Sequence, residues 1–177
     1  MGGETIESRE KGKFMSNLVV VVFKDMTTAF EMRAALAKMQ REYLIEMEDA
    51  VVVTKDLNGK AQLHQAMNLT TAGAAGGGFW GLLIGTIFLN PLLGMAIGAG
   101  AGALSGKLSD VGVSDQMMKD MAAAFTPESS ALFVLVRKAT PDKVLEGLKA
   151  FAGKGKVYKT SLGADSEAAL RKVLEGA

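Results

Sequence analysis

The sequence predicts an α+β fold, a ferredoxin-like antiparallel sandwich that is interrupted by a glycine-rich helical hairpin. Three observations support this class. Short β-branched apolar runs alternate with segments of helical periodicity. Their order, strand–helix–hairpin–helix–strand, is typical of ferredoxin-like domains. The stretch from Ala61 to Gly106 contains no Asp, Glu, Lys or Arg, whereas charged residues occur throughout the chain on both sides of it.

The first arm begins with a predicted strand at Leu18–Phe23 (LVVVVF), because a continuous β-branched run is typical of a strand buried on both faces. Thr28 and Glu31 have the spacing of a capping box, which predicts the start of a helix. Apolar residues at helical spacing define the face of this helix that is expected to point inward: Met32, Leu36, Met39 and Tyr43.

A second strand is predicted at Ala50–Thr54, and Asn58-Gly59 predicts a type I′ hairpin turn after it. The alternating segment Ala61–Gln65 is expected to be the return strand, at an edge of the sheet.

The second arm begins with a predicted helix that Ser114 caps and Pro127 stops. Its apolar positions are Met117, Met118, Met121 and Phe125. Ala131–Val136 (ALFVLV) is a further predicted core strand.

The dipeptide Thr140-Pro141 predicts another helix with proline at its first position, ending at Gly153. Val157 and Tyr158 are expected in a short edge strand, and Asp165 is expected to cap the last helix. The inward residues of these two helices are predicted to be Val144, Leu145, Leu148, Phe151, Leu170, Val173 and Leu174.

These elements divide the chain into three parts. Residues 1–14 are a charged segment, expected to be a flexible tail. Residues 15–66 and 110–177 are predicted to form one ferredoxin-like domain together, and residues 67–109 are the glycine-zipper hairpin inserted into it.

Within the insert, glycine recurs at every fourth position in two runs, which the dipeptide Asn90-Pro91 separates. At about 3.6 residues per turn, each run makes a nearly continuous stripe without side chains along one face of a helix. Because backbones approach closely along such stripes, we expect helix–helix interfaces there. The predicted interface residues are Gly73, Gly77, Gly81, Gly85, Gly94, Gly98, Gly102 and Gly106.

The insert has two interpretations. Thr70–Leu89 comprises 20 uncharged residues, about 30 Å of helix, which matches the hydrocarbon thickness of a bilayer. Leu92–Gly106 has 15 residues, about 22 Å, and would insert only as the partner of the first helix. The alternative is a hairpin in the interior of a soluble homo-oligomer, since so apolar a segment cannot stay exposed on a monomer. We favour membrane insertion, because a long segment without charge is the usual signal for a spanning helix.

The composition limits the kinds of functional site that the chain can contain. The absence of cysteine excludes disulfides, thiolate metal ligands and cysteine nucleophiles. Basic and acidic residues nearly balance, at 20 and 19, which argues against nucleic acid as a partner. We expect no catalytic, cofactor-binding or metal-binding residues and no cofactor, and the chain is predicted not to be an enzyme.

Four weaker signals are each better explained without a ligand. The run from Gly73 to Gly78 lacks the apolar parallel strand and the later acidic residue that a dinucleotide site needs. His64 is the only histidine, expected to be exposed on an edge strand. The acidic group Glu46, Glu48 and Asp49 is expected to be solvated rather than to bind a cation. The basic group Lys154, Lys156 and Lys159 is expected to protect an edge strand.

Four stretches of the sequence together resemble a bacterial family of unknown function, domain-of-unknown-function family 1269, which is described as predicted membrane proteins. They are NLVVVVF, TAFEMRAALAKMQREYLIEMEDAVVVT, KAQLHQAMNLTTAGAAGGGFWGLLIGTIFLNPLLG and ALFVLVRKATPDKVLEGLKAF. The resemblance covers nearly everything after Met15. It implies no activity, ligand or catalytic residue.

Our hypothesis is a non-enzymatic, self-associating bacterial protein whose hairpin enters or lies on the inner membrane, in a membrane-organising or pore-forming role. Its partners are then membrane lipid and further copies of the chain. Lys60 and Lys107 flank the insert and predict that the soluble arms lie in the cytoplasm. The alternative is a cytoplasmic shell or scaffold with the hairpins in its interior. A weaker alternative is a small-molecule-binding stress-response module, which depends only on analogy of fold.

The glycine stripes lead to a testable expectation. Leucine at Gly81 or Gly98 should force the helices apart, because overpacking typically costs about 1–3 kcal/mol per site. We expect Gly81→Leu and Gly98→Leu to lose the oligomer while the α+β domain stays folded. Alanine at the same positions should be mild, and Ile84→Leu, off the stripe, should leave assembly intact. Size measurement in detergent with circular dichroism tests this, and unchanged oligomers in both leucine variants would contradict it.

Overall fold

The computed structural model describes residues 17–65, 120–121, 123–158 and 162–176. Its elements are bounded as follows: β1 (Asn17–Phe23), α2 (Thr28–Arg41), β2 (Ile45–Lys55), β3 (Ala61–Gln65), β4 (Ser129–Ala139), α7 (Pro141–Gly147), the 3-10 helix η1 (Leu148–Phe151), β5 (Gly155–Tyr158) and α8 (Ala164–Glu175). Residues 120, 121, 123 and 124 are also helical. The expected fold class is therefore confirmed in its coarse form, an antiparallel sheet with helices.

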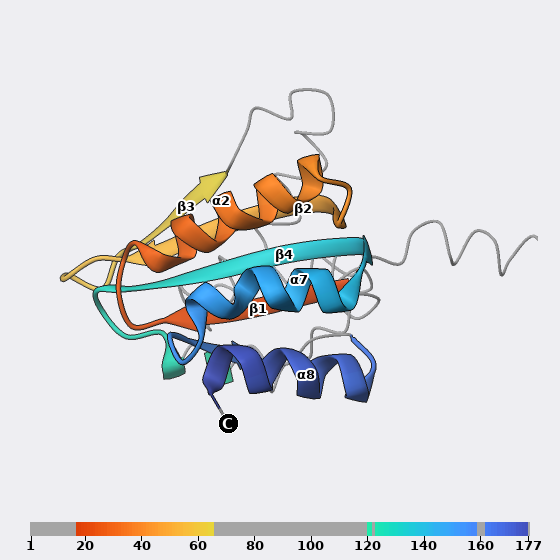
Figure 1. The fold of residues 1–177 in the computed structure, drawn as a ribbon. Helices are drawn as coiled ribbons and strands as arrows, with labels where there is room; N and C mark the ends of the chain where they lie inside the picture. The colour runs from red at the N-terminus through yellow and green to blue at the C-terminus, as the bar shows by residue number, and fades with distance from the viewer. Residues whose placement is uncertain (1–16, 66–119, 122, 159–161, 177) are drawn as a thin grey trace, which may run out of the picture.

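The five strands form one antiparallel sheet in the order β3-β2-β4-β1-β5. Strand β4 lies between β1 and β2, so the two charged arms of the sequence contribute neighbouring strands (Figure 1). Strands β3 and β5 are the two edges, as expected for the segments Ala61–Gln65 and Val157-Tyr158.

Helices α2, α7 and α8 lie side by side over one face of this sheet (Figure 1). The alternate residues Val19, Val21 and Phe23 of β1 face them and share a core cluster with all three helices. Most of the expected inward residues are buried in it, namely Met32, Leu36, Met39, Val144, Leu148, Phe151, Leu170 and Leu174. Leu145 and Val173 are half-buried at its margin.

Gly147 allows α7 to approach α2 closely. A Cβ atom at this position would lie 2.6 Å from the terminal methyl of Met39, which is closer than packed side chains allow. The contact places the end of α7, the middle helix of the layer, against α2 (Figure 1).

The start of α2 differs from the expected capping box. The N-cap residue is Thr27, and its side chain makes no cap hydrogen bond. Instead, the carboxylate of Asp25 accepts bonds from the backbone N–H of Thr27 at 2.8 Å and of Thr28 at 2.7 Å. The hydroxyl of Thr28 donates to the other oxygen of Asp25 at 2.7 Å. Asp25 thus satisfies two of the free amides at the start of the helix.

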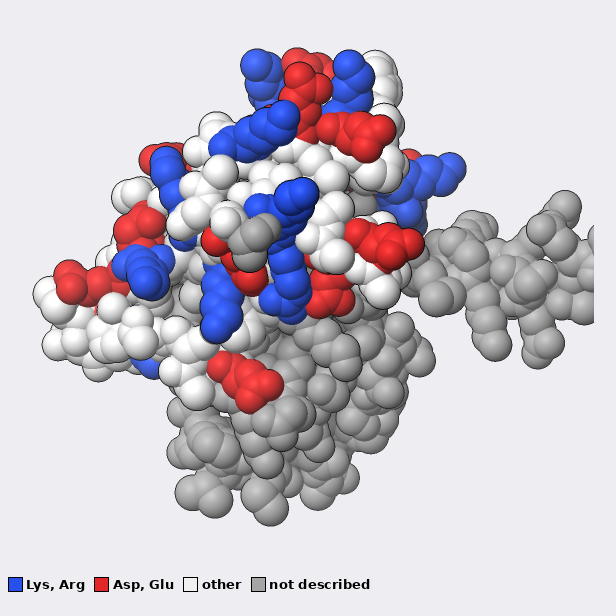
Figure 2. Space-filling view, turned by 60° about the horizontal axis from the view of Figure 1, so that its bottom comes forward, with Lys and Arg blue, Asp and Glu red and all other residues white. Residues whose placement is uncertain are grey.

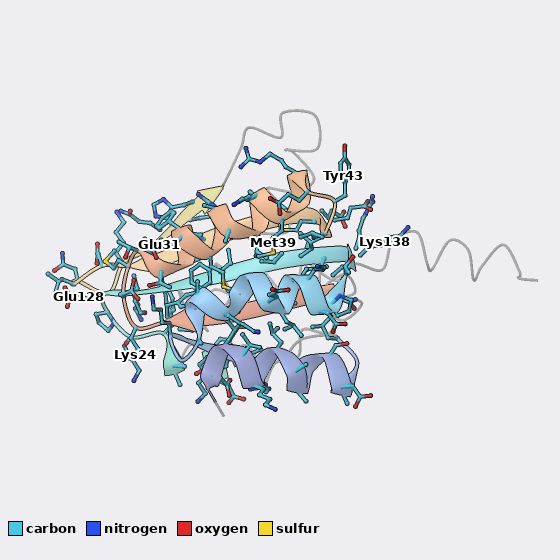
Figure 3. All side chains as sticks on the ribbon, in the orientation of Figure 1. Lys24, Glu31, Met39, Tyr43, Glu128 and Lys138 are labelled. Atoms are coloured by element: carbon cyan, nitrogen blue, oxygen red, sulfur yellow. The ribbon has the colours of Figure 1, made fainter. Side chains whose placement is uncertain are left out.

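The end of α2 also departs from the expectation. Tyr43 was expected on the buried face, but its side chain is 94% exposed and points away from the domain (Figure 3). The helix ends at Arg41, and Tyr43 has a φ of 60°. The N–H of Tyr43 bonds to the carbonyl of Gln40, and that of Leu44 to the carbonyl of Met39. This is a Schellman motif, in which the left-handed residue reverses the chain and leaves the helical face.

The hairpin between β2 and β3 is present, but its turn is not type I′. That turn needs positive φ at both central residues, and of the pair only Gly59, with a φ of 80°, has it. The loop is five residues long, from Asp56 to Lys60. The side chain of Asp56 accepts bonds from the N–H groups of Asn58 and Lys60, both at 2.9 Å, which stabilises this longer loop.

Two further local predictions need correction. The last helix has Gly163 as its N-cap, and Asp165 lies in the first turn rather than at the cap. The helix that begins at Pro141 gives way to η1 at Leu148. Gly153, with a φ of 71°, lies in the turn that follows η1.

The network at Asp25 predicts a pH-dependent stability. Partial burial alone would raise the pKa of Asp25, but the hydrogen bonds from Thr28 and Thr27 outweigh it and lower the pKa from 3.8 to about 2. A carboxylate with a lowered pKa stabilises the fold above its unfolded pKa, and this stabilisation is lost as the pH falls towards 2.

We therefore expect Asp25→Ala to be about 1 kcal/mol less stable than the unmodified protein at pH 7. Asp25→Asn keeps an oxygen acceptor without the charge and should lose less. The deficit of both variants should shrink between about pH 4 and pH 2. Urea unfolding followed by circular dichroism measures it, and a deficit that stays constant over that range would contradict the role of the carboxylate.

Candidate interaction surface

The sheet has a second apolar face, opposite the three helices. Its strands contribute the residues that alternate with those of the helix-covered face: Leu18, Val20, Val51, Val53, Ala131, Phe133 and Leu135. All of them are buried. The sequence carried a signal for this surface, because strands with apolar residues at consecutive positions must be covered on both faces.

The described residues supply little of this cover. Outside the sheet, Met121 and Phe125 are the only described residues in the cluster on this face, and each is 1% exposed. Both were expected on the apolar side of the helix before Pro127. Met121 and Phe125 thus follow the glycine-rich part of the sequence and pack directly on the second face.

Phe125 and Glu128 are hydrogen-bonded to Lys55 at the end of β2. The ammonium group of Lys55 donates to the carbonyl of Phe125 at 3.0 Å and lies 6.0 Å from the centre of its ring. The N–H of Glu128 donates to the carbonyl of Lys55 at 2.8 Å. Glu128 adopts a φ of 62°, which turns the chain into β4. Nothing in the sequence around Lys55 indicated this role, because the contact joins residues 70 positions apart.

The other end of the insert begins at β3, where His64 contacts α2. His64 is half-buried rather than exposed, with its ring packed edge-on against Phe30 at 5.1 Å. Its Nε2 atom lies 2.9 Å from the hydroxyl of Thr54. Arg33 donates to the carbonyl of His64 at 2.8 Å and lies over the ring of Phe30. Burial lowers the pKa of Arg33. These contacts hold the last described strand before the insert against the helix layer.

The predicted glycine interface lies outside the described residues. This applies to all eight positions, Gly73, Gly77, Gly81, Gly85, Gly94, Gly98, Gly102 and Gly106, and to the glycine run that we compared with a dinucleotide turn. The interface therefore stays a prediction from the sequence.

The acidic group is divided between two sets of contacts. Glu46 and Glu48 of β2 lie 3.7 and 3.9 Å from the guanidinium of Arg137 on β4. Asp49 accepts a bond from the N–H of Ala50 at 2.8 Å. Among the described residues, no three acidic or histidine side chains come together as a metal-binding group.

Of the basic group, Lys154 is exposed before β5, and Lys156 lies 5.5 Å from the ring of Tyr158. Lys159 lies outside the described residues. Figure 2 shows basic and acidic side chains mixed over the described part of the face that it presents. No helix in the described parts of the chain has the length and apolarity needed to cross a membrane.

Comparison with known proteins gives one match. The model of a family described as "Protein of unknown function (DUF1269)" matches residues 74–175. This range includes much of the glycine-rich segment and all of β4, α7, β5 and α8. No curated protein and no solved structure matches the chain. Because the match covers more than half of the sequence and agrees with the resemblance noted above, the chain belongs to the DUF1269 family.

Proposed function

We propose that this chain is a non-enzymatic, self-associating membrane protein, in which an α+β domain carries a glycine-zipper hairpin, residues 67–109, into or onto the bilayer. The single observation that carries the proposal is the uncharged stretch from Ala61 to Gly106, with glycine at every fourth position. Such a stretch favours the hydrocarbon phase, and its glycine stripes favour close helix packing there. A membrane-organising or pore-forming assembly is the role that suits both properties.

The architecture of the domain supports separate roles for the α+β domain and for the hairpin. Helices α2, α7 and α8 and the sheet share an apolar core. The insert lies in the connection between β3 and β4, which are not neighbours in the sheet, so a long connection there leaves the pairing of every described strand intact. The insert is therefore free to supply an interaction of its own.

We further propose that the domain is ferredoxin-like. Its repeated unit is β1-α2-β2 followed by β4-α7-β5, with β3 as an additional edge strand. The order β2-β4-β1-β5 within the sheet supports this assignment, since two interleaved strand–helix–strand units give that arrangement.

We place the protein in the bacterial inner membrane with its α+β domain in the cytoplasm. The basis is the pair of lysines, Lys60 and Lys107, that flank the uncharged segment, because basic residues next to spanning segments favour the cytoplasmic side.

A second candidate is a cytoplasmic homo-oligomeric shell or scaffold with its hairpins in the interior. It rests on the same uncharged stretch, because so apolar a segment cannot stay exposed on a monomer. Hairpins packed against one another in the interior of an oligomer would remain out of water without a bilayer.

Fractionation of cells distinguishes the two candidates. The unmodified protein should pellet with membranes and resist high-salt and alkaline washing. Leu83→Asp places a charge within the longer apolar run, at a cost of about 2.5–3.5 kcal/mol for insertion, and should move protein into the supernatant. Leu57→Asp is the matched control, because Leu57 lies in the β2–β3 loop and is 73% exposed. It should fractionate like the unmodified protein. Unmodified protein found wholly in the high-speed supernatant as a discrete particle would contradict insertion and support the scaffold.

A further inference from the structure

The core between the sheet and its helices contains a cavity of about 300 Å³. It lies beneath α7 and α8 and over β1 and β4. Its walls are the aliphatic side chains of the core, such as Val134, Leu148 and Leu170. The cavity is not enclosed but partly open to solvent.

The mouth of the cavity is marked by its exposed lining residues. Asp142 lies in the first turn of α7, and Asp165 and Ser166 lie in the first turn of α8. These three residues are exposed, as are the lining residues Ala139 and Pro141, whereas the other described lining residues are buried or half-buried. The two helices run side by side in the same direction (Figure 1), so their first turns form one rim.

The chemistry of rim and walls differs sharply. Among the described lining residues there are two carboxylates and one hydroxyl, all at the rim, and no lysine or arginine. The start of a helix alone would favour an anion. Here an anionic ligand would meet Asp142 and Asp165 at that place, so the rim favours a cation instead.

We propose that this cavity binds a small molecule with an apolar body and a cationic ammonium group at one end. The apolar body occupies the space beneath α7 and α8, and the ammonium group lies between the carboxylates of Asp142 and Asp165. A volume of about 300 Å³ is at the lower end of the range for small-molecule sites. The body is therefore a single ring or a short branched chain. This site is independent of the glycine-rich segment and of the proposed function above.

The test uses two probes of the same shape, 2-phenylethylamine and 2-phenylethanol. The first carries an ammonium group where the second carries a hydroxyl. Purified full-length protein, in lipid nanodiscs or in buffer as its solubility requires, is titrated with each probe and followed by methyl NMR and calorimetry. We expect both to bind, the amine about fivefold more tightly, as exposed charge pairs contribute modestly. Methyl shifts should be largest at Leu36, Leu148 and Leu170 and absent at Val51 and Val53 on the opposite face.

Two variants of α8 locate the site. Ala169 lines the cavity, whereas its neighbour Ala168 is exposed and does not. Ala169→Leu should reduce the affinity for both probes at least tenfold, while Ala168→Leu, the matched control, should leave both unchanged. The double variant Asp142→Asn, Asp165→Asn should remove the advantage of the amine and leave the affinity for the alcohol as it was.

Several results would overturn the proposal. Binding of neither probe at millimolar concentration would show that the cavity is not a ligand site. Binding that Ala169→Leu does not weaken, or shifts centred on Val51 and Val53, would place the probes elsewhere. Equal affinities for amine and alcohol would refute the cationic part. If Ala169→Leu fails to fold, the methyl shifts of the unmodified protein decide the location alone.

Discussion

Phe133 of β4 is paired with Val20 of β1 on one side and with Val51 of β2 on the other, and this central position of β4 holds the two arms of the chain together. The pairing closes the long connection that begins after β3. Because the entropy of loop closure grows by only about 0.6 kcal/mol for each doubling of length, the sheet tolerates a long insert there. The helix layer, the second apolar face and the cavity all depend on β4 being in place.

Much of the fold could be predicted because its signals are local. The runs LVVVVF and ALFVLV mark strands that are buried on both faces, and the 3.6-residue periodicity of Met32, Leu36 and Met39 marks a helix. The errors fall where one residue pattern has two structural solutions. Thr28 and Glu31 match a capping box, but the carboxylate of Asp25, which precedes the helix, accepts the bonds from the N–H groups of Thr27 and Thr28. Tyr43 continues the period, but the helix ends at Arg41 and Tyr43 itself adopts the left-handed conformation.

The candidate functional features also include some that local sequence patterns predict and some that they do not. The glycine stripes follow from sequence spacing alone, and the second apolar face follows from the uninterrupted apolar strands. The sequence could not predict the hydrogen bond from Lys55 to the carbonyl of Phe125. Nor could it predict that Asp142 and Asp165 line the mouth of one cavity. Each joins residues that only tertiary packing brings together, and neither has a local pattern. The α+β domain thus has an apolar sheet face that the sequence pattern predicts and a cavity that only the packing of its helices creates.

The central claim is that the hairpin enters a membrane from the side on which the α+β domain lies. The chain contains no cysteine, so single cysteines report position without background. In intact cells treated with a membrane-impermeant thiol reagent, Asn90→Cys at the tip of the hairpin should be labelled, because it is expected on the outer side. Lys60→Cys, in the exposed β2–β3 loop, should be labelled only after the cells are opened. Protection of both positions in intact cells, with labelling of both after lysis without detergent, would contradict a spanning hairpin.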